Sequence, residues 1–338
     1  MTTPKKISYG FITLLLVLVC VLHLSTPFIT VLFSYFALTK LRFGRGKGLA
    51  VTLFVVLVVL FGFGFYYFAK QACVALPRIA AATVPAVIKY AQKYGVELPF
   101  SDYAEFKELV REALAAKAVG VGYFAKAVLI EVAAFVIGIV SAVSLFLSAR
   151  FQLEPEPQSV KNNLYSLAWA EIAERFRTFY ASFSTVMGAQ ILISGINTVL
   201  TGIFLLWTGV PYATVLVVVT FLCGLLPIIG NLLSNTLIVG VCLTISLHLA
   251  LLALVFLIAI HKLEYFLNSK IIGQRIRNPM WLTLLGLIIG EKLMGVPGMI
   301  LAPVVLHYIK VEASRNKVAD APSESVPQTP QAQPLSRH

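Results

Sequence analysis

Long apolar runs separated by short polar segments dominate this sequence. They cover residues 7–22, 27–39, 49–69, 127–149, 183–208, 211–230, 232–260 and 279–309. Between Thr178 and His261 there is no Asp, Glu, Lys or Arg over 84 residues. The hydrocarbon core of a bilayer, about 30 Å thick, takes about 20 apolar residues per helical crossing. The pattern therefore predicts an all-α membrane protein, a polytopic helical bundle of about eight membrane segments.

Composition supports a membrane protein. Of the 338 residues, 59% are apolar and 12% are charged, whereas soluble domains have about 45–50% and about 25%. The net charge of +12 raises the question of a nucleic-acid partner. Because the basic residues lie in short segments between apolar runs and not on one solvated face, we interpret them as topology signals. We expect the lipid bilayer, and no nucleic acid, as a partner.

The amino-terminal run 7–22 is followed by further apolar runs and by no small-x-small cleavage site, so it predicts a retained first span. The run 27–39 is too short to cross alone and is expected to form a hairpin with the first. Lys5, Lys6 and the basic loop 40–47 place both ends of this hairpin in the cytoplasm.

Charge and composition divide the rest of the chain. Asp102, followed three residues later by Glu105, is typical of a helix start. We expect N-terminal membrane segments at 1–69, an extramembrane amphipathic helical region at 70–126, a membrane span at 127–149, a cytoplasmic interfacial helix at 150–182, a membrane core with broken helices at 183–311 and a disordered tail at 312–338.

Two Gly/Pro interruptions divide the apolar carboxyl half. GLLPIIGN spans 224–231 and GEKLMGVPG spans 290–298. Proline removes a backbone donor, and unwound backbone survives in a membrane only beside protein or water. Paired broken segments are typical of transporter binding sites. The predicted broken or re-entrant helices have as their motif residues Gly224, Pro227, Gly295, Pro297, Gly298 and Pro303.

A polar row and a glycine row lie on opposite faces of the fifth run. The polar row is Gln190, Ser194, Asn197 and Thr201, and the glycine row is Gly188, Gly195, Gly202 and Gly209. Spacings of three, four and seven residues align each row along one helical face. Both rows are explained as helix-packing contacts, or the polar row is the wall of a conduit. On the second interpretation the substrate path also includes Pro227, Gly230 and Asn231.

Four polar residues are candidates for ion or proton coupling. Glu264, supported by Asn268 one turn later, is the first candidate, and Glu131 and Glu291 are the others. An interfacial glutamate is an alternative for Glu131, and a re-entrant tip reaching water or a buried charge contact for Glu291. His261 and Glu264 lack a third metal ligand, and there is no nucleotide-binding motif. We expect no metal, no cofactor and no enzyme activity.

Three motifs in series carry a resemblance to a known family. GLLPIIGN from Gly224, HKLEYFLNSKIIG over 261–273 and GEKLMGVPGMILAPVV over 290–305 resemble the autoinducer-2 exporter family of bacterial permeases. The resemblance is strongest over 183–310. Asn231 and Lys270 stand where many relatives carry proline. The resemblance implies a helical, homo-oligomeric permease of the bacterial inner membrane, with a signalling molecule exported in some relatives and sodium or lithium exchanged for protons in others.

Three functional hypotheses remain open. The leading one is a secondary transporter or facilitator that moves a small polar solute, such as autoinducer-2, across the inner membrane. The second is a sodium (lithium)/proton antiporter, which transports a monovalent cation. The third is a non-transporting membrane scaffold that uses the glycine row for docking.

Overall fold

The computed structural model describes residues 2–42, 44, 46–115, 121–148, 163–226, 229–272 and 279–315, and side chains are not described for 113–125, Tyr265, 268–272 and Met280. Over the described residues the chain is helical and without strands, which confirms the all-α prediction. The helices are α1 Thr3–Val21, α2 Ser25–Leu41, α3 Lys47–Lys93, α4 Tyr103–Ala115, α5 Val121–Leu147, α6 Leu164–Trp207, α7 Ala213–Gly224, α8 Ile229–Ile245, α9 Leu247–Ile272, α10 Met280–Met294 and α11 Val296–Arg315.

Six of these helices are long and apolar enough to cross a membrane. They are α1, α3, α6 and α11 in full, and parts of α5 and α9. The apolar helices α7 and α8, with 12 and 17 residues, are shorter. The predicted count of about eight segments therefore mixes full-length spans with short helices. The protein is a multi-pass membrane protein.

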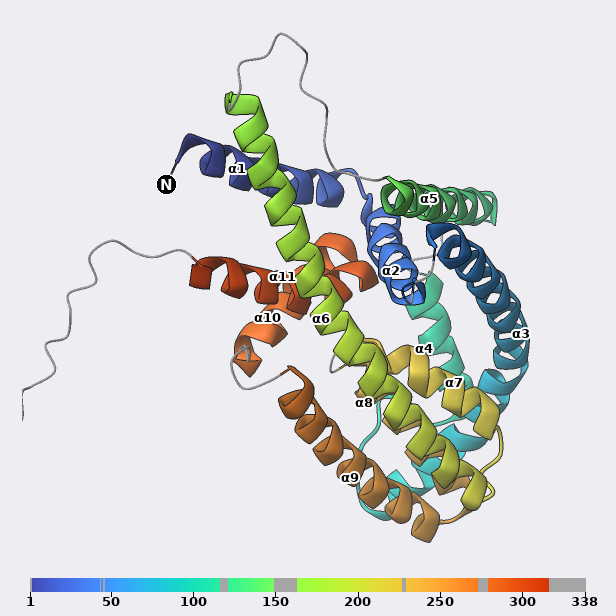
Figure 1. Ribbon diagram of the computed structural model, residues 1–338. Helices are drawn as coiled ribbons and strands as arrows, with labels where there is room; N and C mark the ends of the chain where they lie inside the picture. The colour runs from blue at the N-terminus through green and yellow to red at the C-terminus, as the bar shows by residue number, and fades with distance from the viewer. Residues whose placement is uncertain are drawn as a thin grey trace, which may run out of the picture.

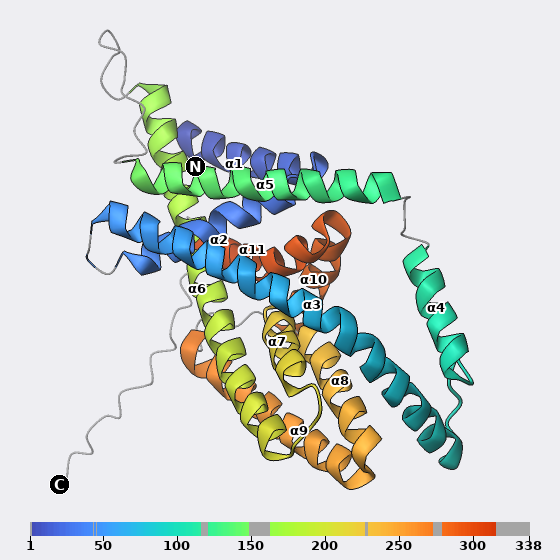
Figure 2. The ribbon, with the colours of Figure 1, turned by 90° about the vertical axis from the view of Figure 1, so that its right-hand side faces the viewer.

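Helix α6, with 44 residues, is the longest helix in the carboxyl half of the described chain. It runs diagonally through the molecule, with α1, α2 and α11 beside its amino-terminal half and α7 and α9 beside its carboxyl-terminal half (Figure 1). From the side, α3 extends past α7 and α8, and α4 lies beside its far end (Figure 2). Two apolar clusters follow α6: Phe183 and Met187 pack against α11, and Phe204 and Leu205 pack among α3, α7, α8 and α9.

Several helix boundaries differ from the boundaries in composition. Helix α3 continues past residue 69 to Lys93 although it contains Pro77 and Pro85. Helix α6 crosses the 182/183 boundary without interruption, and its buried face continues across it at helical spacing through Phe179, Phe183 and Met187. The turn after α1 lies where expected, but α1 packs along α6 and α2 along α5, so these two helices do not pair as a hairpin.

The predicted start of α4 is confirmed. A side-chain oxygen of Asp102 accepts a hydrogen bond of 2.7 Å from the Glu105 backbone N–H, and Glu105 accepts one of 2.7 Å from the Ser101 N–H. The Ser101 backbone N–H and then its hydroxyl lower the pKa of Glu105, because both donate to its charged form. Residues 116–120, 149–162 and 316–338, which include most of the predicted tail, lie outside the described residues.

Both predicted interruptions fall at helix ends. Helix α7 ends at Gly224 and α8 begins at Ile229, and Pro227 between them lies outside the described residues. Helices α10 and α11 meet at Gly295, whose φ of +64° favours glycine. A Cβ atom on Gly290 would overlap the backbone of Gly298, so only glycine lets these two segments approach so closely.

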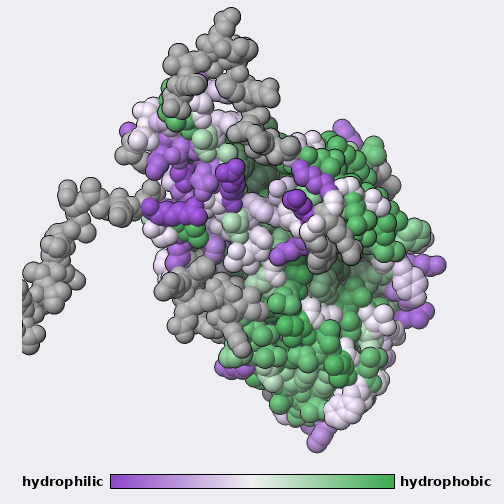
Figure 3. All heavy atoms as spheres, in the orientation of Figure 1, coloured by the Kyte–Doolittle hydropathy of each residue, from purple (hydrophilic) through white to green (hydrophobic). Residues whose placement is uncertain are grey.

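Exposed surface differs between the two ends of the molecule. Apolar side chains cover the region around α9 and the carboxyl half of α6, whereas hydrophilic residues gather where α1, α6 and α11 meet (Figure 3). Leu206 and Trp207 are 74% and 78% exposed. Such a contiguous apolar surface is typical of contact with lipid or another protein.

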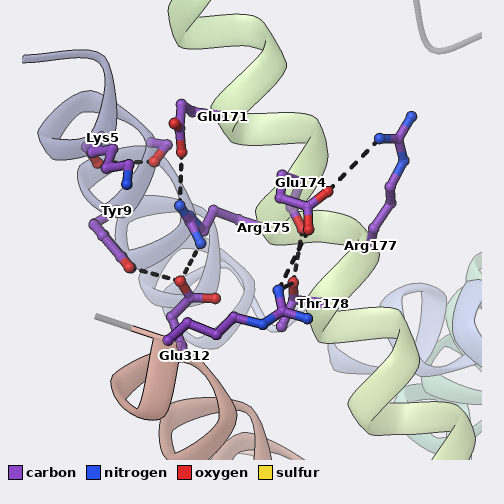
Figure 4. A network of polar contacts seen from close by, with 10 residues as sticks. Lys5, Tyr9, Glu171, Glu174, Arg175, Arg177, Thr178 and Glu312 are labelled. Atoms are coloured by element: carbon purple, nitrogen blue, oxygen red, sulfur yellow. Dashed lines mark hydrogen bonds and ion pairs between the residues drawn. The ribbon is translucent and has the colours of Figure 1, made fainter. Parts of the chain in front are cut away.

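The hydrophilic end contains a buried ion-pair network (Figure 4). Arg175 of α6 pairs with Glu312 of α11 and, at 2.7 Å, with Glu171. Tyr9 of α1 donates to Glu312 at 2.7 Å, and its ring centroid lies 4.9 Å from the Arg175 guanidinium. Arg175 and Glu312 are only 6% and 5% exposed. The network therefore fixes α1 and α11 against α6.

We expect Glu312→Gln to lower the free energy of unfolding by about 1–3 kcal/mol, because one partner of a buried pair is removed while Glu171 still accepts from Arg175. Chemical unfolding of the detergent-solubilised protein measures this. Glu291→Gln is the matched control. It removes an exposed carboxylate 3.7 Å from the Lys292 ammonium, and should change stability by less than about 0.5 kcal/mol. Equal effects of the two substitutions would contradict this account of the network.

Candidate functional site

A small polar cavity lies between α6, α7, α8 and α9. Its volume is about 10 Å³, close to the smallest space that holds one water molecule. Its polar lining consists of Asn197, Thr201, Thr220, Asn231, Ser234, Asn235, His261 and Glu264, and Leu257 and Ile260 complete it. A group of polar side chains within an apolar bundle is typical of a binding site.

Helical spacing explains how four separate segments supply this lining. Asn197 and Thr201 are four residues apart on α6, Asn231 and Ser234 three apart on α8, and His261 and Glu264 three apart on α9. Residues three or four apart share one face of a helix. Helices α6, α8 and α9 therefore each present neighbouring polar residues to the same space, and α7 adds Thr220.

Glu264 is the only carboxylate of the cavity lining. Its side chain is 13% exposed, and its Oε2 accepts a hydrogen bond of 2.6 Å from the Asn231 amide. The nearest basic group is His261, whose Nδ1 lies 3.8 Å from the same oxygen and whose side chain is 61% exposed. Helices α7 and α8, and α6 from residue 178 on, carry no Lys or Arg. The buried side of the cavity is therefore negative whenever Glu264 is ionised.

Oxygen atoms dominate the remaining lining. The Oδ1 atom of Asn197 is buried and has no hydrogen-bond partner among the residues that the structure describes. Thr201 and Ser234 are 1% and 2% exposed and add hydroxyl oxygens. Carboxylate, amide and hydroxyl oxygens are the ligands that hard metal cations prefer. The arrangement can hold a small cation, or a proton on Glu264 together with a water molecule.

The predicted polar row divides into two pairs. Asn197 and Thr201 line the cavity, whereas Gln190 donates to the carbonyl of Gly224 at 2.6 Å and Ser194 to that of Phe221 at 2.9 Å. One pair therefore faces a polar space and the other makes a helix contact. The helix-contact interpretation therefore describes Gln190 and Ser194, and the conduit interpretation stays a prediction for Asn197 and Thr201.

The glycine row does not make one continuous contact. A Cβ atom on Gly188 would lie 3.7 Å from the Phe36 ring, and one on Gly202 would lie 3.4 Å from Val217. Gly195 and Gly209 have open space at this position. Gly209 instead has a φ of +64° beyond the end of α6. Close packing therefore does not require glycine along the whole row.

The other predicted residues lie away from the cavity. Glu131 is exposed on α5, and Glu291 is half-exposed beside Lys292, which agrees with the interpretation of a solvent-reaching segment. Gly295, Pro297, Gly298 and Pro303 belong to the α10–α11 region and are not among the lining residues. Pro227 and the side chain of Asn268 lie outside the described residues.

Three lining residues were missed by the sequence analysis: Thr220, Ser234 and Asn235. Ser234 and Asn235 follow Asn231 by three and four residues, and this spacing is the signal that could have identified them. Thr220 gives no such signal, because its hydroxyl donates to the Leu216 carbonyl of its own helix, as threonines in apolar helices commonly do.

Comparisons with known proteins give the class. The model of the AI-2E family transporters matches residues 8–314, and the chain belongs to this family. The family is described as one of transporters, and a charged, polar cavity inside an apolar bundle agrees with that description.

A relative from Bacillus subtilis (strain 168), described as "Putative transport protein YdbI", is 28% identical over 195 residues. The matched part covers 56% of each protein, so the chain spans about half the length of the curated relative it matches.

The contact between α7 and α8 gives a direct test of this site. We expect Gly230→Ala to lower the free energy of unfolding by at least about 1–3 kcal/mol, because its Cβ would overlap the Cys223 carbonyl. The matched control is Gly195→Ala in α6, where the space is open and alanine favours the helix by up to about 1 kcal/mol. Thermal unfolding in detergent measures both. The site geometry is wrong if both variants unfold like the wild type.

Proposed function

We propose that this protein is a secondary transporter that binds a monovalent cation or a proton at Glu264 and couples this binding to the movement of a small polar solute. The observation that carries the proposal is a polar cavity, partly open beside His261, in which the nearly buried Glu264 bonds the Asn231 amide and the described lining contains no Lys or Arg. A lone carboxylate within an apolar bundle is costly to ionise unless a cation or proton neutralises it.

The geometry supports coupling at Glu264 better than at the other carboxylates. Glu264 is the most enclosed of the three candidates and holds a contact between two helices, α8 and α9. Glu131 and Glu291 face outward and have no such contact. Neutralising Glu264 would change the strength of its hydrogen bond with Asn231, so that occupancy of the site and the α8–α9 contact are linked.

Cation/proton exchange is the second candidate, and the size of the cavity favours it. About 10 Å³ accommodates one water-sized group, which includes a small monovalent cation but not a sugar-like signalling molecule. On this hypothesis the cation and proton compete for Glu264. On the leading hypothesis the same site holds the driving ion, and the solute uses a wider path that opens during the cycle.

Substrate and location follow the family's description in part. Autoinducer-2 enters the solute panel because the family is described as AI-2E transporters. We propose the bacterial inner membrane as the location, since the basic loops between apolar helices follow the positive-inside pattern.

Glu264→Gln is expected to reduce transport at least about tenfold, because an amide neither takes up a proton nor neutralises a cation. The protein is reconstituted in liposomes containing a pH-sensitive dye. Proton movement is followed after addition of Na⁺, Li⁺ or K⁺, and uptake of a panel of labelled polar solutes, including autoinducer-2, is followed with and without a pH gradient.

Glu131→Gln is the matched control, because it removes an exposed carboxylate of a membrane helix outside the cavity. It should leave every flux within about twofold of the wild type. If Glu264→Gln transports as fast as the wild type, the proposed role of Glu264 is wrong. Ion exchange without solute uptake would select the second candidate.

A further inference from the structure

Gln190 and Ser194 lie outside the cavity, yet they hold the segment that places one of its residues. Both side chains project from α6 to carbonyl groups at the end of α7. Gln190 bonds Gly224 and Ser194 bonds Phe221, and we refer to Gln190 and Ser194 together as the carbonyl clamp. The last carbonyls of a helix have no partner within the helix and need one elsewhere.

The sequence after α7 contains a proline that cannot donate a hydrogen bond to the last carbonyls of this helix. The ordinary helical donor for the Cys223 carbonyl would be residue 227, a proline, which has no N–H. Cys223 instead accepts from the Leu226 N–H at 2.8 Å. The helix cannot continue past this point, and the Phe221 and Gly224 carbonyls instead accept hydrogen bonds from side chains of α6.

The clamp acts at close range because Gly224 has no side chain. A Cβ atom on Gly224 would overlap the Ser194 hydroxyl. The next contact along the chain is equally close, since a Cβ atom on Gly230 would overlap the Cys223 carbonyl. Two glycines thus make a continuous path of close contact from the Ser194 side chain of α6, through the end of α7, to the start of α8.

That path ends at the cavity. Asn231 follows Gly230 directly, and its amide donates to Glu264 at 2.6 Å. Gly230 and the Cys223 carbonyl are in such close contact that the start of α8 must move with the end of α7. A displacement of the α7 end relative to α6 therefore moves Asn231 relative to Glu264. The hydrogen bond between Asn231 and Glu264 is 2.6 Å long, and it is weakened once this distance exceeds about 3.2 Å.

We infer that Gln190 and Ser194 are positioning residues, which hold the end of α7 and the start of α8 so that the Asn231 amide stays bonded to Glu264. This inference rests on the proposed role of Glu264 for its consequence in transport, but not for the clamp itself. It replaces the view that all four members of the polar row line one conduit.

Hydrogen exchange of the full-length protein in detergent tests the clamp without transport. Gln190→Leu and Ser194→Ala should raise amide exchange about three- to tenfold at residues 222–226 and 229–234, the range expected from losing one hydrogen bond. Exchange in α10 and α11 should not change. Thr185→Val is the matched control, because its hydroxyl bonds only the Ala181 carbonyl of its own helix.

A double-mutant cycle tests the positioning role. Asn231→Ala removes the donor, so Gln190→Leu should raise the KM for the transported ion several-fold when Asn231 is present and add little to Asn231→Ala. The ions are Na⁺, Li⁺ and H⁺ in the liposome assay described above. A purely structural role would lower the amount of folded protein and maximal flux, and would add to the Asn231→Ala effect.

The inference is supported if exchange rises only at residues 222–226 and 229–234 and if the effects of Gln190→Leu and Asn231→Ala on KM are not additive. Unchanged exchange at 222–226 and 229–234, equal increases in α10 and α11, or additive effects on KM would overturn it. Failure of the proposed function gives a different result: the wild-type protein then shows no ion flux. Hydrogen exchange still tests the carbonyl clamp in that case.

Discussion

The structure depends most on how one carboxylate is kept inside a region without other charged groups. Residues 178–260 carry no Asp, Glu, Lys or Arg, and Glu264 extends from α9 into the side of the bundle that they form. Its partners are the Asn231 amide and, at the mouth, His261. Because neutral dipoles balance a charge less well than an opposite charge does, the proposed function assigns a cation or a proton to this carboxylate.

Glycine makes this arrangement possible by letting neighbouring segments approach closely. Gly224 and Gly230 bring α6, α7 and α8 together beside the cavity, and Gly290 and Gly298 bring α10 and α11 together elsewhere. The buried pair of Arg175 and Glu312 fixes α11 and α1 to the other half of α6. Helix α6 is therefore the common support of both ends, since one unbroken helix carries Arg175, the carbonyl clamp and two cavity residues.

The class of fold and part of the site could be predicted from sequence because both depend on local spacing. Apolar runs predict membrane helices, the polar row is visible as an exception within one such run, and Glu264 is visible beside His261 just after another. What spacing could not predict is which neighbour each polar group meets. Ser194 and Asn197 share a helical face, yet one bonds a backbone carbonyl and the other lines a cavity. Likewise, composition placed boundaries at 69/70 and 182/183, where α3 and α6 continue because helix geometry does not require a uniform environment.

The central claim is that Glu264 takes up and releases the coupling ion. Electrophysiology on a solid-supported membrane measures this directly, because a jump in cation concentration or pH produces a transient current when charge enters or leaves a membrane site. The account predicts such a current for the wild type and its loss in Glu264→Gln. Currents of the same size and ion dependence in both proteins would contradict it.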